Sequence, residues 1–190
     1  MSAHEAVAER AYTIPRIAAN LICTCLLSGV ILAGTYYVTN PIAVEKNKML
    51  EKQAMQALVP QAVDFEALDD KEAWFAAKNG AGTEIAYVLP ARNKGYGGSI
   101  RMLVAVALDG RVLDYAILES NETPGLGDGA AKDYFKDRIR GKTADALVVV
   151  KDPSDTVHVD ALTGATITSR AVTEGVRAAA EEVSAFVGGR

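Results

Sequence analysis

Three glycine-containing segments hold the residues of this sequence whose types and spacing could support chemistry. They are Gly95–Gly98 (GYGG), Glu122–Gly127 (ETPGLG) and Asp160–Ser169 (DALTGATITS). Taken singly, each segment is also typical of an ordinary turn, because glycine and proline occur in loops of every kind. The third segment carries more information, because several hydroxyl and carboxylate side chains gather there, directly before a predicted helix.

The Asp160–Ser169 segment is suited to bind a phosphate group. A helix N-terminus has unpaired N–H groups and a partial positive charge, and both favour an anion. Gly164 has no side chain, so a ligand could approach the backbone closely there. The alternative is an ordinary helix N-terminus that is capped by Thr168 or Ser169. That alternative explains one hydroxyl, but it gives no role to Thr166.

Other common kinds of active site are missing from the sequence. The part that follows the first forty residues has one histidine, His158, and no cysteine. Neither a zinc site nor a cysteine–histidine nucleophile can be assembled from it. It also lacks the GxGxxG and GxxxxGKS patterns that bind nucleotides. His158 lies in a predicted strand, which favours a structural role. The net charge of −4, with no basic cluster, argues against nucleic-acid binding.

The first forty residues predict a membrane-spanning helix. Ile17–Val38 carries no charged side chain. At about 1.5 Å per residue, this helix would be roughly 33 Å long, enough to cross a hydrocarbon core of about 30 Å. Tyr36 and Tyr37 lie at its far end, where aromatic residues favour the interface, and Pro41 is expected to end it. A cleaved signal peptide, whose apolar run is usually about 7–15 residues, and a buried core helix are the alternatives.

Neither lipid attachment nor a metal site is predicted in this helix. Leu32-Ala33-Gly34 faintly resembles a lipoprotein box, but Thr35 stands where the lipidated cysteine is needed. Cys23 and Cys25 would point about 200° apart on a helix, so they cannot chelate one ion together. We interpret them as small apolar residues. The alternative is that one of them donates a single ligand to a cluster shared with another subunit.

The flanking charges give no preference for either membrane orientation. Arg10 and Arg16 precede the apolar segment, whereas Lys46, Lys48 and Lys52 follow it. The positive-inside rule counts basic residues close to the span, and two against three is nearly a tie.

The rest of the sequence predicts a small α+β domain in which an antiparallel sheet is flanked by helices. Strand patterns cover residues 84–89, 100–108, 111–118, 147–150 and 157–159. Asp109-Gly110 predicts a hairpin with a tight primed turn. Helices are expected at residues 43–58, 71–78, 130–139 and 169–187, with Tyr134, Phe135 and Ile139 as apolar anchors of the third. The apolar stripe of the last helix consists of Val172, Val176, Ala179, Val183, Phe186 and Val187.

The three segments together resemble the covalent FMN-binding domain family. TGAT followed by Ile-Thr-Ser and preceded by Asp160 is similar to the flavinylation motif of that family, and ETPGLG and GYGG fit it in the same order. With a single N-terminal span, the whole chain resembles the G subunits of Rnf ion-translocating ferredoxin:NAD oxidoreductase complexes. The C subunits of sodium-pumping NADH:quinone oxidoreductases are longer relatives.

The resemblance implies a cofactor and a set of residues that bind it. Thr166 would form a phosphoester with FMN, and a separate flavin transferase would recognise Asp160, Gly164 and Ala165. The other cofactor-binding residues would be Thr163 in the same segment and Glu122, Thr123, Gly125 and Leu126 beside the isoalloxazine ring. The role of Gly95–Gly98 is left open, since these glycines could simply shape the entry to a strand. No catalytic residue and no metal ligand is expected.

The resemblance also implies an organisation and a location. Residues 1–16 would be a short flank, 17–39 a transmembrane helix, 40–60 a helical stalk and 61–190 the FMN-binding domain. The domain would lie on the extracytoplasmic side of the bacterial inner membrane, beside other membrane and peripheral subunits. The chain would relay electrons through FMN without being an enzyme alone. Two alternatives are a subunit that binds flavin without a relay, and a structural subunit of another membrane redox complex.

Overall fold

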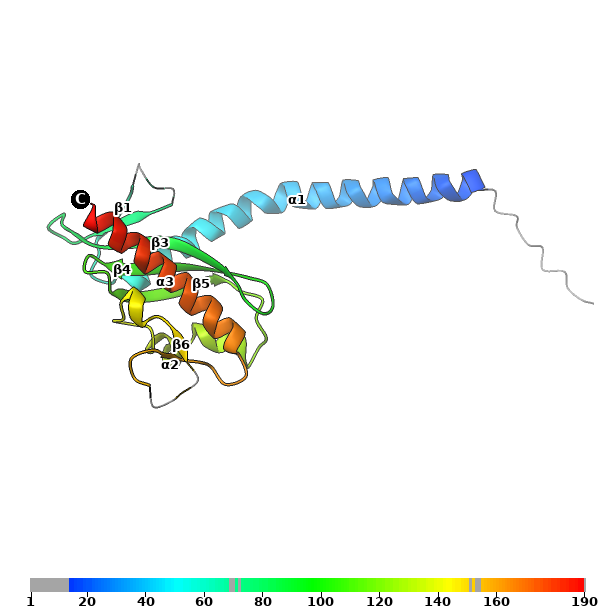
Figure 1. The fold of residues 1–190 in the computed structure, drawn as a ribbon. Helices are drawn as coiled ribbons and strands as arrows, with labels where there is room; N and C mark the ends of the chain where they lie inside the picture. The colour runs from blue at the N-terminus through cyan, green and yellow to red at the C-terminus, as the bar shows by residue number, and fades with distance from the viewer. Residues whose placement is uncertain (1–13, 69–70, 72, 151, 153–154, 190) are drawn as a thin grey trace, which may run out of the picture. The chain divides into compact units, whose positions relative to one another are not determined.

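The structure is a computed structural model that describes residues 14–68, 71, 73–150, 152 and 155–189. The chain divides into two compact units, Met1–Lys48 and Met49–Arg190, and each is described by itself. The helix α1, Ile14–Leu58, begins in the first unit and ends in the second. The remaining elements all belong to the second unit (Figure 1).

The N-terminal part of α1 is the one helix of the described residues that is long and apolar enough to cross a membrane. Its most apolar stretch has a mean hydropathy of 2.1, and none of that stretch is buried. A core helix of a soluble domain would be buried, so the burial contradicts that alternative. The helix fits a single-pass membrane subunit.

The expectation that Pro41 ends this helix is wrong. Helix α1 continues through Pro41 to Leu58, so the helix expected over residues 43–58 is its continuation. Proline has no N–H, so it loses one helical hydrogen bond and its ring crowds the preceding turn. The helix-forming residues that follow it and the burial of Met55 and Leu58 against the sheet stabilise the continuation.

A five-stranded antiparallel sheet forms the centre of the second unit. Its strands are β1 (Asp64–Ala67), β2 (Phe75–Lys78), β3 (Glu84–Lys94), β4 (Ser99–Ala107) and β5 (Val112–Glu119), and they lie in the order β1-β2-β3-β4-β5. With its flanking helices, this sheet confirms the predicted α+β class. The helix expected at residues 71–78 is wrong, because Phe75–Lys78 pairs with β1 and β3. Strand β1 was not predicted.

Both faces of the sheet are covered, which explains why β2 does not show a simple alternation. On one face, Ala76 joins the core cluster under the C-terminal helix α3, Thr166–Gly188. On the other face, Ala77 joins the cluster that contains Met55 and Leu58 of α1. Since both side chains are buried, the strand reads as a short apolar run, and a run of that kind does not distinguish a strand from a helix.

Two local features of the sheet differ from the sequence expectation. Strand β3 continues past Pro90, where it still pairs with β4. Its pairing with β2 stops at the Phe75–Val88 pair, so Pro90 lies where β3 is an edge strand on that side, and an edge tolerates the missing N–H of proline. The hairpin at Asp109-Gly110 is present, but among the described turn residues only Gly110 has a positive φ, of 80°. A primed turn needs a positive φ at its first central residue, so the turn is of another type, with a register shift beside it.

The segment between β5 and α3 contains short elements. They are the 3₁₀ helices η1 (Gly127–Ala131) and η2 (Ala144–Ala146), helix α2 (Asp133–Lys136), and the parallel pair β6 (Val149–Val150) and β7 (Val159–Asp160). The helix expected over residues 130–139 is therefore only one turn long, and Tyr134, expected as an anchor, is 56% exposed. Phe135 and Ile139 are buried as expected. The strands predicted at 147–150 and 157–159 are present as two-residue strands.

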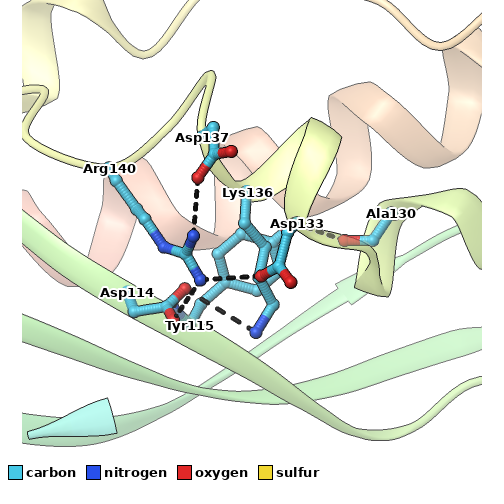
Figure 2. Close-up of polar contacts among 7 residues, drawn as sticks. All are labelled: Asp114, Tyr115, Ala130, Asp133, Lys136, Asp137 and Arg140. Atoms are coloured by element: carbon cyan, nitrogen blue, oxygen red, sulfur yellow. Dashed lines mark hydrogen bonds and ion pairs between the residues drawn. The ribbon is translucent and has the colours of Figure 1, made fainter.

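A cluster of ion pairs attaches this segment to the sheet (Figure 2). The Arg140 guanidinium lies 2.7 Å from Asp114 on β5 and 3.0 Å from Asp133 on α2. The hydrogen bond with Asp114 is the main cause of the raised pKa of Arg140. Beside it, the hydroxyl of Tyr115 donates a hydrogen bond to the carbonyl oxygen of Ala130. Burial raises the pKa of Tyr115, which keeps this hydroxyl protonated as a donor.

We predict that Tyr115→Phe lowers the free energy of unfolding by about 1–2 kcal/mol, because the carbonyl of Ala130 loses its donor in a buried place. The measurement is urea unfolding of the full-length protein in detergent, followed by the emission of Trp74, the single tryptophan, which is buried. Tyr134→Phe is the matched control, because that ring is exposed. Equal unfolding midpoints for the two variants would contradict the prediction.

Candidate functional site

The N-terminus of α3 is open to a ligand. The helix begins at Thr166, and its N-cap residue is Ala165, which makes no side-chain cap hydrogen bond. The alternative in which Thr168 or Ser169 caps the helix is therefore wrong. Because alanine has no side-chain acceptor, the N–H groups of the first turn are left for another partner. This is the geometry that binds phosphate at a helix N-terminus.

Ser169 shapes the loop before the helix instead of capping it. Its hydroxyl accepts a hydrogen bond from the N–H of Leu162 and donates one to the carbonyl of Ala165, both at 2.9 Å. Gly164 lies between these two residues with a φ of 78°, a conformation in which a side chain is strained. The sequence Leu162–Ser169 thus forms a tight turn that holds Thr166 at the first position of the helix.

Glu122 joins the three glycine-containing segments. Its carboxylate is 9% exposed and accepts hydrogen bonds from the N–H of Gly97, at 3.0 Å, and from the hydroxyl of Thr168, at 2.5 Å. Gly97 belongs to the first segment, Glu122 to the second and Thr168 to the third. Buried carboxylates are stable when such donors satisfy them, and bonds to charged groups are the stronger kind.

The glycines around Glu122 are required by its close packing. A Cβ at Gly95 would lie 2.2 Å from the Glu122 carboxylate, and one at Gly97 would lie 1.9 Å from the carbonyl oxygen of Asn121. At Gly127, a Cβ would meet the side chains of Glu122 and Thr168 at 2.7 to 2.9 Å. The open question about Gly95–Gly98 thus has a structural answer, since this loop receives the carboxylate of Glu122.

A cavity of about 600 Å³ lies where the three segments meet. Its lining residues are Tyr96, Glu122, Thr123, Leu126, Gly127, Gly164, Ala165, Thr166, Ile167 and Thr168. The volume is in the range of sites for small-molecule cofactors, about 300–1,000 Å³. Thr166 lines this cavity and is half-buried, while its backbone is fixed as the first residue of the helix.

The cavity brings together six of the nine residues predicted as cofactor-binding: Glu122, Thr123, Leu126, Gly164, Ala165 and Thr166. The other three are outside its lining. Gly125 has a φ of 78° and open space around it, Thr163 is exposed, and Asp160 pairs with Arg138 at 3.0 Å.

Four lining residues were not predicted as cofactor-binding. Gly127, Ile167 and Thr168 lie inside or beside the quoted segments, and Tyr96 lies between the glycines of the first one. Tyr96 and Ile167 are 72% and 55% exposed, so they form an apolar rim at the mouth of the cavity. The sequence feature that could have identified Tyr96 and Ile167 is a large apolar or aromatic side chain within a glycine-rich or polar segment.

The residues fit a flavin phosphate. The first turn of α3 offers N–H groups, the loop at Gly164 lets a phosphate approach, and Leu126 and Tyr96 offer apolar surfaces for a ring. No group of three His, Cys, Asp or Glu side chains that could hold a metal ion is found within the described part of the chain.

His158 lies in the bend before β7 and not in a strand, so its predicted strand position is wrong. Its Nδ1 atom lies 2.7 Å from the carboxylate of Asp155. The N–H groups of His158 and Val157 also donate to that carboxylate. These bonds, led by the N–H of His158, lower the pKa of Asp155 to about 2.

Comparison with known proteins identifies the family of this chain. The family described as "FMN-binding domain" matches residues 95–181, which span the three segments. The G subunit of the proton-translocating ferredoxin:NAD(+) oxidoreductase complex of Clostridium ljungdahlii is 51% identical over 174 residues, covering 92% of this chain and 94% of that protein. The chain belongs to the family of Rnf complex G subunits. The corresponding protein of the Na(+)-translocating complex of Acetobacterium woodii is 35% identical over 167 residues, 76% of this chain and 79% of that protein.

A solved structure shares the fold of this chain. The crystal structure of Shewanella oneidensis NqrC aligns with a TM-score of 0.52 at 22% identity, covering 68% of this chain and 73% of that one. This likeness shows the shared fold. The relatives and the family match above confirm, at the level of the family, the resemblance stated from the motifs.

We predict that Glu122→Ala lowers the free energy of unfolding by about 1–3 kcal/mol, because the Gly97 N–H and the Thr168 hydroxyl lose their acceptor. Urea unfolding of the full-length protein followed by Trp74 emission is the measurement. Glu182→Ala is the matched control, because Glu182 is an exposed residue on α3. An unfolding midpoint for Glu122→Ala equal to that of the control would contradict the joining role of the carboxylate.

Proposed function

We propose that Thr166 carries FMN as a phosphoester and that the chain relays electrons through this flavin within an ion-translocating ferredoxin:NAD oxidoreductase complex. The observation that carries the proposal is the position of Thr166. Its hydroxyl stands at the first residue of an uncapped helix, in a cavity of about 600 Å³, within a segment that matches the FMN-binding domain family. The similarity to the G subunits from Clostridium ljungdahlii and Acetobacterium woodii supports the proposal that this chain belongs to such a complex.

The attachment forms one bond and breaks another. The Thr166 oxygen bonds to the flavin-side phosphorus of a flavin dinucleotide, the phosphoanhydride bond to the adenylate breaks, AMP leaves and the hydroxyl proton goes to solvent. A separate flavin transferase performs this step. The exposure of Thr163 and Gly164 supports recognition by another protein, because both lie beside Thr166 and are accessible.

The residues around Thr166 have separable roles in this proposal. The first-turn N–H groups of α3 bind the phosphate, whose negative charge the helix N-terminus stabilises. Thr123 offers a hydroxyl to the ring system, while Leu126 and Tyr96 pack on it. FMN supplies the redox chemistry, and the protein supplies position and electrostatics. The carboxylate in the cavity lining, Glu122, is engaged by the Gly97 N–H and the Thr168 hydroxyl, which suits a structural role in an electron-transfer site better than acid–base catalysis.

The N-terminal apolar helix and the family support a proposed location. In this proposal, helix α1, which is long and apolar enough to span a bilayer, anchors the chain by a single pass in the bacterial inner membrane. The resemblance to Rnf G subunits suggests that the domain lies on the extracytoplasmic side. Other membrane and peripheral subunits of the complex are its partners. An ester bond suits that location, because a flavin lost outside the cytoplasm could not be replaced easily.

We predict that the protein, produced with its flavin transferase, fluoresces under ultraviolet light on a denaturing gel, whereas Thr166→Ala does not. Denaturation removes non-covalent flavin, so the gel reports the ester alone. Thr83→Ala is the matched control, because it removes an exposed hydroxyl that lies outside the three segments and outside the cavity lining.

A fluorescent band of Thr166→Ala would exclude this residue as the attachment site. A dark wild-type band from the native host would instead favour a subunit that binds flavin non-covalently or clamps its partners.

We also predict that the isolated, flavin-loaded chain accepts electrons from a chemical reductant but does not oxidise NADH. The reason is that the sequence has no nucleotide-binding fingerprint. Anaerobic absorbance at the flavin band, first with dithionite and then with NADH, measures both properties. Rapid bleaching by NADH alone would contradict the role of a relay subunit.

A further inference from the structure

Asp160, the acidic residue of the attachment motif, is occupied by a contact within the chain. One guanidinium nitrogen of Arg138 lies 3.0 Å from its carboxylate and donates a hydrogen bond of 2.7 Å to its carbonyl oxygen. The same nitrogen is 3.4 Å from the carbonyl of Ala161. Arg138 therefore holds both the side chain and the backbone at the start of the segment that ends at Thr166.

Arg138 is itself fixed by the core. It lies between Phe135 and Ile139, whose side chains are fully buried, and its guanidinium stands 6.0 Å from the centre of the Phe135 ring. The N–H of Arg138 also donates to the carbonyl of Phe135, at 3.1 Å. The pair thus connects a rigid part of the domain to the loop.

The loop has few other attachments before α3. Asp160 is the last residue of the two-residue strand β7, and the N–H of Ala161 donates to the carbonyl of Val150 on β6 at 3.0 Å. The next bonds along the chain lie within the turn itself, from the N–H of Ala165 to the carbonyl of Leu162 and between Ser169 and both of these residues. Arg138 and the backbone bond of Ala161 to Val150 fix one end of the turn, Arg138 being the one side chain that holds the Asp160 carboxylate, and Ser169 fixes the other end. The direction in which the Thr166 hydroxyl is presented depends on both ends.

We propose that Asp160 promotes flavin attachment through Arg138, as one unit of two positioning residues, and not by contacting the transferase itself. This inference rests on the attachment of FMN to Thr166. A direct contact would need a free carboxylate, whereas this one is engaged with Arg138, and each side chain is only one-third exposed. Arginine suits the role, because its planar group can bind a carboxylate and carbonyl oxygens at once.

The test is a double-mutant cycle on full-length protein in detergent. Arg138→Ala, Asp160→Ala and the double variant are incubated with purified flavin transferase and flavin dinucleotide, and the initial rate of covalent labelling is measured by in-gel fluorescence. We expect each single change to slow labelling by roughly tenfold or more, because a small misplacement of a reacting group has effects of that size. The double variant should label within about twofold of the slower single variant, because the two residues act as one unit.

Additive losses would overturn the proposal, since they mean that Asp160 contacts the transferase independently. Wild-type labelling rates in both single variants would overturn it as well. Arg101→Ala is the matched control, because Arg101 pairs with Glu51 and Glu119 away from the cavity and should label at the wild-type rate.

Two further measurements separate the outcomes. Trp74 emission reports whether each variant is folded. If Arg138→Ala does not fold, Arg138→Lys, which keeps the charge, replaces it in the cycle. A loss of stability with unchanged labelling would assign the pair a purely structural role and overturn the proposal. Labelling of wild type but not of Thr166→Ala tests the attachment site itself, so failure of the cycle and failure of the proposed function are distinguishable.

Discussion

The carboxylate of Glu122 is the contact on which the candidate site depends. It accepts hydrogen bonds from Gly97 in the β3–β4 hairpin and from Thr168 in the first turn of α3, while Glu122 itself belongs to the loop after β5. A buried carboxylate without donors would destabilise the fold strongly. The packing of the three segments around Glu122 therefore depends on its two hydrogen bonds. The cavity beside Thr166 is the space that remains between them.

The sheet and α3 convert this contact into a rigid site. Helix α3 packs on one face of the sheet through Val172, Val176 and Val183, which are fully buried, so the position of its first turn is set by the core. The hydroxyl of Ser169 and the guanidinium of Arg138 then fix the loop that precedes the helix. Thr166 is consequently fixed in its backbone yet half-exposed in its side chain, as modification by a second protein requires.

The parts of the fold that follow strong periodicity could be predicted from the sequence. The stripe of α3, the strands around the Asp109-Gly110 hairpin and the N-terminal apolar helix are of this kind. The strand within residues 71–78 could not be predicted, because β2 is buried on both faces and so lacks the alternation of apolar and polar residues that indicates a strand. Six of the nine predicted cofactor-binding residues meet at the cavity, because they lie in recognisable segments. The role of Arg138 required tertiary structure, since it is 22 positions away from Asp160.

The most direct test of the FMN ester at Thr166 is peptide mass spectrometry of the chain purified from its native host. We predict that the peptide containing Thr166 is heavier than its sequence by the mass of FMN less one water, and that fragmentation places the added mass on Thr166. An unmodified Thr166 peptide, or the same added mass on Thr163 or Thr168, would contradict the assignment.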